Sequence, residues 1–289
     1  MTSDFLFQLT RQYRAYVGTF READGLLPDM LRLKLEHTQG VVQDARSIMG
    51  GEAWDEPSRV LGEACALLHD AGRYEQFKTF GTFQDSKSVD HAAYGVRIIR
   101  EQRWLDGLPV AERNLVLATV ALHNRRTVSP AASERVARFT HLVRDADKLD
   151  IFRVLEQAIA DGSLERNPEI AWGLQHKGAP SRNVVEAIRQ GHSVSYTWIR
   201  TLSDFILIQV GWLIGGLHYP TSYRLAAQRK VLEFRETFLK TLSDDPGIEV
   251  CCQAARDYFA ALSASCLGRN AISAAPASAT AISTEKPSA

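Results

Sequence analysis

The chain has 289 residues with 34 basic and 34 acidic side chains, so its formal net charge is zero. This balance excludes the basic excess that nucleic-acid-binding proteins carry. Apolar residues make up 45% and charged residues 24% of the chain, a composition typical of a folded globular protein and not of a disordered one.

Helical periodicity begins near the N-terminus and continues over nearly the whole chain. Apolar residues recur every three to four positions in the segments that we predict to be helices: 3–18, 29–49, 56–72, 88–103, 109–126, 133–160, 181–191, 197–216, 221–243 and 246–267. Ser88 and Ser133 are suited to cap helix N-termini, and Pro28, Pro109 and Pro246 fall at or just before helix starts. No segment shows the alternation of a strand, so we expect an all-α fold.

Two segments and the C-terminus interrupt this periodicity. Residues 73–87 and 161–180 are predicted to be loops, and residues 270–289, rich in Ala, Ser, Thr and Pro, to be a disordered tail. The most apolar stretch, 205–217, is too short to span a bilayer, so we expect a buried helix there. Asp4 stands where a secretion signal needs basic residues, and the four cysteines show no metal-ligand spacing, so we expect a cytoplasmic protein that binds no membrane.

Histidines and aspartates form an ordered series along these helices. The members of the series are His37, the dipeptide His69-Asp70, His91, His123 and Asp147. Any one histidine on an apolar helix face is most simply a hydrogen-bonded core residue. Four imidazoles and two carboxylates on inward faces all need partners, however, and two divalent metal ions would satisfy them together. The mixture of nitrogen and oxygen ligands suits iron, manganese or zinc.

Charge balance indicates the chemistry of such a site. Two divalent ions carry four positive charges, and two aspartates return only two negative ones. The site would therefore attract an anion and hold a nucleophilic hydroxide between the ions at neutral pH.

The order H…HD…H…H…D resembles the two-metal form of the HD-domain superfamily of metal-dependent phosphohydrolases, over roughly residues 30–160. The stretches that begin at His69, Phe80 and Ser88, and the later Arg144-Asp-Ala-Asp-Lys-Leu-Asp, are similar to a bacterial subgroup described only as HD-domain proteins. The resemblance implies an HD-domain helical bundle over residues 1–160. Residues 161–269 would form a C-terminal helical extension packed on this core, followed by the tail 270–289.

The resemblance also implies a role for each member of the series. The first metal ion would be held by His37, His69, Asp70 and Asp147, and the second by Asp70, His91 and His123. Asp70 would thus bridge the two ions. Iron and manganese are the favoured metals, and zinc, magnesium, cobalt and nickel also suit these ligands.

Two aspartates compete for the last ligand position. Asp145 and Asp147 are two residues apart, so on a helix their side chains point roughly 200° away from each other and only one can face the metals. Periodicity alone does not separate them. The family pattern favours Asp147 and would leave Asp145 and Asp150 to orient ligands or to bind basic side chains.

Basic and polar residues near the series are predicted to serve catalysis and substrate binding. We predict catalytic roles for Asp70, for Arg73 four residues after His69, and for Lys148. We predict that Arg73, Gln76 and Arg125 contact the substrate, because they follow the metal ligands in segments suited to shape the site.

The sequence thus predicts a phosphohydrolase that cleaves a small phosphate ester or nucleotide with a metal-bridging hydroxide. Monoester and diester cleavage both stay open, as does homo-oligomerisation. One alternative is a two-iron HD-type oxygenase acting on a diol or phosphonate, since its ligands are alike. A second alternative is a non-catalytic, nucleotide-binding regulatory module, which would be expected to have lost part of the ligand set.

Overall fold

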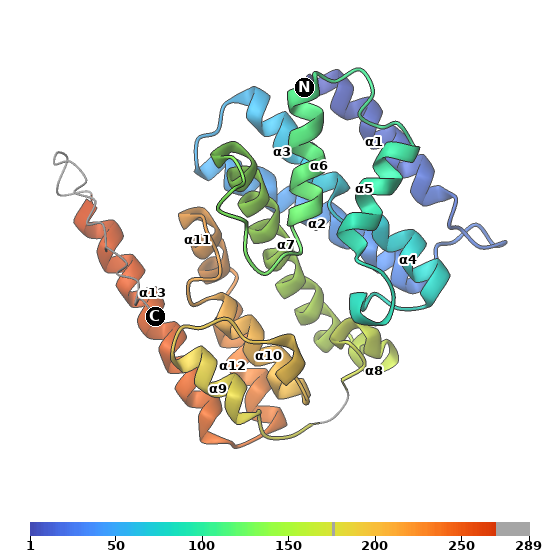
Figure 1. Ribbon diagram of the computed structural model, residues 1–289. Helices are drawn as coiled ribbons and strands as arrows, with labels where there is room; N and C mark the ends of the chain where they lie inside the picture. The colour runs from blue at the N-terminus through green and yellow to red at the C-terminus, as the bar shows by residue number, and fades with distance from the viewer. Residues whose placement is uncertain (175–176, 270–289) are drawn as a thin grey trace, which may run out of the picture.

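The computed structural model describes residues 1–174 and 177–269, with side chains to residue 262, so the predicted tail 270–289 lies outside the described residues. Within them the chain is all-α and contains no strand (Figure 1). Its helices are α1 (Ser3–Gly18), α2 (Asp29–Gly51), α3 (Glu56–Leu68), α4 (Gly72–Phe80), α5 (His91–Glu101), α6 (Val110–Leu122), α7 (Glu134–Ala160), α8 (Ser163–Arg166), α9 (Arg182–Arg189), α10 (Leu202–Trp212), α11 (Pro220–Gln228), α12 (Val231–Leu242) and α13 (Pro246–Arg269).

The first seven helices form a bundle around the long helices α2 and α7. Helix α2 packs against α3 and α7, and α4, α5 and α6 follow one another around the bundle, with α6 returning to α7. Val41 and Ile48 of α2 and Leu142 and Leu149 of α7 are fully buried in this core. Burial of such side chains contributes about 1.5–3 kcal/mol each, so the bundle provides a rigid frame for polar residues placed inside it.

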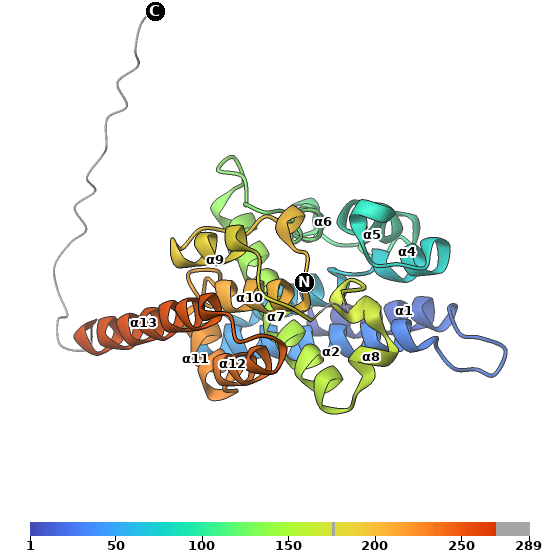
Figure 2. The ribbon, with the colours of Figure 1, turned by 90° about the horizontal axis from the view of Figure 1, so that it is seen from below.

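Residues 181–269 form a second group of helices beside the bundle, seen below it in Figure 1. Helix α10 is buried along Leu202–Val210 and packs against α9, α12 and α13, as its apolar sequence predicted. Helix α11 joins this group to the bundle by packing against α2 and α7. Figure 2 shows α13 running out along one side of this group. No helix in the described part of the chain is long and apolar enough to cross a membrane.

Local capping explains where several helices begin. The Ser133 side chain accepts a hydrogen bond from the Val136 N–H and caps α7, as predicted. The prediction for Ser88 is wrong, because α5 begins at His91 and its cap is Asp90, whose side chain accepts from the backbone N–H groups of Ala92 and Ala93. The helix therefore starts later than predicted, and His91 is its first residue.

The structure also corrects two predicted segments. Helix α4 occupies much of the predicted loop 73–87, and the predicted helix 56–72 ends at Leu68. A Cβ on Gly72 would lie 2.3 Å from the His91 carbonyl oxygen, so glycine there allows α4 to approach α5 closely. The predicted helix 221–243 is broken at Lys230, whose φ of 54° is left-handed and separates α11 from α12.

Candidate metal centre

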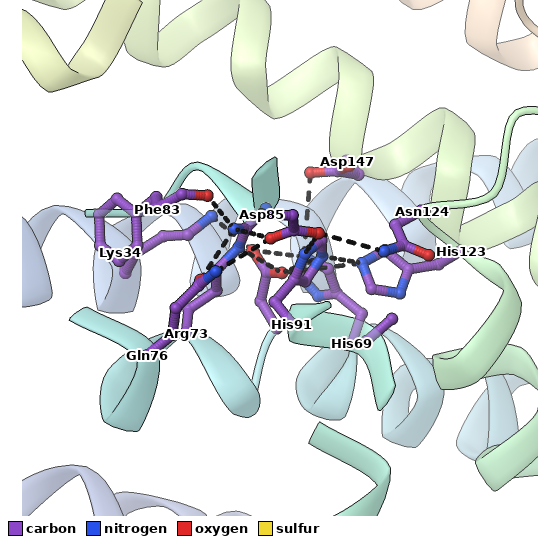
Figure 3. A network of polar contacts seen from close by, with 12 residues as sticks. Lys34, His69, Arg73, Gln76, Phe83, Asp85, His91, His123, Asn124 and Asp147 are labelled. Atoms are coloured by element: carbon purple, nitrogen blue, oxygen red, sulfur yellow. Dashed lines mark hydrogen bonds and ion pairs between the residues drawn. The ribbon is translucent and has the colours of Figure 1, made fainter. Parts of the chain in front are cut away.

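Five helices bring the six candidate ligands together at the middle of the bundle. They are His37 on α2, His69 and Asp70 directly after α3, His91 at the start of α5, His123 directly after α6, and Asp147 on α7. All are buried except Asp147, whose side chain is 24% exposed. Figure 3 shows Asp147 approaching from α7, with His69, His91 and His123 on the opposite side of the centre.

The two carboxylate oxygens of Asp70 face two different pairs of histidines. Oδ2 lies 3.8 Å from Nε2 of His37 and 3.4 Å from Nε2 of His69. Oδ1 lies 3.3 Å from Nε2 of His91 and 3.7 Å from Nε2 of His123. Asp70 therefore stands between two groups of ligand atoms, each of which lies within 4.8 Å of the others in its group.

In every one of the four imidazoles, the outer nitrogen Nδ1 is bonded to a protein acceptor. The partners are Asp150 for His37 at 2.7 Å, the Ala66 carbonyl for His69 at 2.7 Å, Asp85 for His91 at 2.6 Å, and the Val120 carbonyl for His123 at 2.7 Å. When Nδ1 donates to these acceptors, Nε2 carries a lone pair directed at the centre. This is the usual arrangement of metal-binding histidines.

The inner nitrogens indicate that this cluster of ligand atoms fits cations. Nε2 of His69 is buried without a hydrogen-bond partner, a state that costs about 1–3 kcal/mol for a neutral group. Nε2 of His37 faces the carboxylate oxygen Oδ1 of Asp147, 3.0 Å away. Nε2 of His91 and Nε2 of His123 lie 3.1 Å apart, so two lone pairs would face each other. A divalent ion near each histidine pair would satisfy these atoms. The residues present therefore fit divalent ions with nitrogen and oxygen ligands, and Asp70 would be within reach of both histidine pairs.

The structure distinguishes the two aspartates that sequence periodicity left open. Oδ1 of Asp147 lies 3.0 Å from Nε2 of His37 and 3.8 Å from Nε2 of His69. Asp145 is buried on another side of α7, where Oδ2 accepts the backbone N–H groups of His218 and Tyr219 at 2.8 and 2.9 Å. Asp147 is therefore the aspartate beside the histidines, and Asp145 ties the C-terminal helices to α7.

Lys34 is a member of this site that sequence reasoning missed. Its ammonium contacts Oδ2 of Asp70 directly. Burial alone would raise the pKa of Asp70, but the charge of Lys34, together with His69 and Arg73, holds the pKa well below its ordinary value. Lys34 precedes His37 by three residues on α2, a spacing that places both on one helix face and could have drawn attention to it.

Arg73 links the centre to the segment that follows α4. Its Nη1 donates to the Phe83 carbonyl, to Gln76 Oε1 at 2.9 Å and to Asp85 Oδ1 at 3.0 Å. Its Nε lies 3.4 Å from Oδ1 of Asp70. The guanidinium thus lies beside the carboxylate of Asp70. Figure 3 shows Arg73 together with its partners Gln76 and Asp85.

Gln76 and Arg125, two predicted substrate contacts, have other partners. Gln76 is fully buried, and its Nε2 donates to Asp85, Ser88 and the Val89 carbonyl, so it positions Arg73 and this segment from within the protein. The Arg125 side chain is 53% exposed and pairs with Asp90 at 2.7 Å. Arg125 therefore lies on the surface beside the start of α5.

Lys148 follows Asp147 but its ammonium is directed at the C-terminal helices. Nζ donates to the Gly216 carbonyl and lies 5.9 Å from the centre of the Trp212 ring. The enclosed surroundings lower the pKa of Lys148 to about 8, while part of the side chain remains accessible to solvent.

Comparison with known proteins identifies one region. Residues 35–152, which include all six candidate ligands, match a family model described as HD domain. No curated protein matches the chain, and no solved structure does.

Proposed function

We propose that the chain, which matches the HD domain over residues 35–152, is a metal-dependent phosphohydrolase that cleaves a small phosphate ester or nucleotide. The observation that carries the proposal is the position of Asp70, with one carboxylate oxygen toward His37 and His69 and the other toward His91 and His123. When bound there, two divalent ions would polarise phosphoryl oxygens and lower the pKa of a water molecule between them.

The residues around Asp70 would hold the ions and receive a phosphoryl group. The four Nδ1 contacts fix the imidazoles with their lone pairs inward, so little reorganisation is needed on binding. Nη2 of Arg73 has no hydrogen-bond partner among the described residues and can donate to a phosphoryl oxygen. Lys34 adds a second positive charge on the same carboxylate.

The proposed metals follow from the ligand types. Imidazole nitrogens with aspartate oxygens suit Fe²⁺ or Mn²⁺ best, with Zn²⁺, Mg²⁺, Co²⁺ and Ni²⁺ as further candidates. The anionic substrate is proposed to be small, because the chain has no net positive charge to attract a long nucleic acid.

A metal-reconstituted activity panel tests the proposal. Protein loaded with each metal is assayed on chromogenic phosphate monoesters, chromogenic diesters and common nucleotides, with Asp70→Asn as the variant that keeps the side-chain shape. We expect release of phosphate or of the leaving group only with metal, and its loss in Asp70→Asn. Wild-type turnover in Asp70→Asn would contradict the assignment of Asp70.

The same panel separates the two alternative functions. Consumption of dioxygen with a diol or phosphonate by the iron-loaded protein, without ester cleavage, would establish the oxygenase. Tight nucleotide binding by fully loaded protein, with no turnover of any ester, would establish a regulatory module. Either result would overturn the phosphohydrolase proposal.

A further inference from the structure

A stripe of basic side chains runs along α7 beside the candidate metal centre. Arg144 and Lys148 are four residues apart and therefore share one helix face, and Asp147 lies next to both positions. His141, three residues before Arg144, continues the stripe. None of the three basic residues is fully buried, so a ligand can reach them.

Arg144 and Lys148 have no carboxylate partner among the described residues. Other cations near the centre are paired: Lys34 with Asp70, Arg73 with Asp70 and Asp85, Arg125 with Asp90, and Arg153 with Asp150. Arg144 instead donates to the main-chain carbonyls of His123, Arg125 and Arg126, and Lys148 to that of Gly216. The two nearest acids are occupied, since Asp145 accepts backbone N–H groups and Asp147 faces His37.

Two histidines stack beside these cations. The rings of His141 and His218 lie 3.3 Å apart between centroids and only 11° from parallel. Burial and the nearby positive charges lower the pKa of both imidazoles, that of His141 to about 4. The pair is therefore neutral near pH 7, so the positive charge of this cluster comes from Arg144 and Lys148.

Partly enclosed cations without a counter-ion are costly unless a ligand completes the pairing. Lys148 has three N–H donors, of which only one is used on Gly216, so it can bind an incoming oxyanion. On the basis of the proposed function, we propose that Arg144 and Lys148, beside the His141–His218 pair, form a second anion subsite. The substrate would carry a phosphoryl group at the metals and a second anionic group, phosphate or carboxylate, at this subsite.

Matched phosphonate probes test the subsite by binding. Propylphosphonate, phosphonopropionate and a propane-linked bisphosphonate share the metal-directed phosphonate, and differ in carrying no second charge, a carboxylate or a phosphonate. Titration calorimetry of the zinc-loaded protein is expected to show about tenfold tighter binding of at least one doubly charged probe. Which of these two probes gains affinity identifies the second group.

Variants of Lys148 test whether this gain in affinity comes from the proposed subsite. Lys148→Met should abolish the difference between the probes, whereas Lys148→Arg should retain most of it. The control is Lys240→Met, the same substitution at an exposed lysine of α12, which should behave as wild type. An unchanged difference in Lys148→Met would show that the second charge binds elsewhere, at the metals for instance, and would overturn the proposal.

Nuclear magnetic resonance gives a readout independent of these variants. The ring signals of His141 and His218, assigned with His141→Gln, should shift with the favoured doubly charged probe and not with propylphosphonate. Equal binding of all three probes to wild-type protein, without these shifts, would overturn the subsite but leave the metal site intact. Failure of zinc-loaded protein to bind any phosphonate would instead contradict the proposed function, and the subsite with it.

Discussion

Oδ2 of Asp150 lies 2.7 Å from Nδ1 of His37, and this contact aligns the opposite ring nitrogen with Asp70 and Asp147. Arg153 donates to both oxygens of Asp150 and fixes the carboxylate from the other side. Gly40, one turn after His37, leaves the space that Asp150 fills, because a Cβ there would lie 1.8 Å from Oδ1. The orientation of a candidate ligand thus depends on a glycine that touches no metal.

Gly40→Ala is therefore expected to weaken metal binding without altering any ligand. The new methyl group must displace Asp150 from His37, and loss of such an orienting contact typically lowers metal affinity by about 10–100-fold. Competition with a chromogenic chelator measures the affinity. Gly50→Ala on the same helix is the control, because a Cβ there meets nothing within 4 Å. Equal affinities in the two variants would show that Asp150 does not set the position of His37.

Because Asp70 lies between two pairs of histidines, variants of Asp70 and of a single histidine should bind different numbers of metal ions. His91→Gln removes a ligand from one side only, so about one ion per chain should remain, whereas Asp70→Asn should retain close to none. Elemental analysis of dialysed protein gives these counts, with the exposed His192→Gln expected to keep two. Loss of both ions in His91→Gln would indicate a single site in place of two.

Hydrophobic periodicity predicted most of the helices, because each of them buries one apolar stripe. It could not predict helices or side-chain contacts that depend on residues distant in the sequence. Helix α4 was missed because close packing of Gly72 on α5, and not an apolar stripe, holds it in place. The series of histidines and aspartates was visible in the sequence, and the family pattern already favoured Asp147 over Asp145. The partner of Asp145 was not visible, because the N–H groups that it binds lie more than 70 residues away. Lys34 was missed for the same reason, since its contact with Asp70 joins α2 to the end of α3.

Arg73→Lys is expected to slow turnover while metal content stays unchanged. Lysine keeps the charge but cannot reproduce the fork of N–H donors that holds Phe83, Gln76 and Asp85 and presents Nη2 to a phosphoryl group. Loss of one positioned donor to a transition state costs about 10²–10³-fold in kcat. Steady-state kinetics on the best substrate of the activity panel, beside elemental analysis, provide the test. A wild-type kcat in this variant would show that Arg73 has no catalytic role.

The metal-free protein should lose stability as pH falls below about 6.5. Burial and the charge of Arg73 lower the pKa of His91 to about 4, although Asp85 acts in the opposite direction. An unfolded chain takes up this proton near pH 6.5 and the folded chain only near pH 4, so stability falls across this window, by about 3 kcal/mol in full. The pKa of His37 is raised in the folded chain, so protonation of His37 stabilises the fold. This stabilisation is complete below pH 6.5 and is lost at higher pH, so it does not change across the window of His91.

Urea unfolding of chelator-treated protein at several pH values across this window measures the effect. His91→Gln should flatten the dependence on pH relative to wild type. Parallel curves for the two proteins would show that His91 is protonated equally in the folded and unfolded chains.

Substitution of Asp145 should lower stability, whereas substitution of Asp147 should weaken metal binding. Asp145→Ala leaves the N–H groups of His218 and Tyr219 without their acceptor, which is expected to lower the free energy of unfolding by about 1–3 kcal/mol while both ions still bind. Asp147→Ala removes an oxygen that lies 3.0 Å from Nε2 of His37, so affinity for the ion on the His37 side should fall. Chemical denaturation and elemental analysis of both variants distinguish the two roles. The two carboxylates point from opposite sides of one helix, so only Asp147 is expected to affect the metal site. A folded Asp145→Ala protein that loses metal would show that Asp145, and not Asp147, is the ligand.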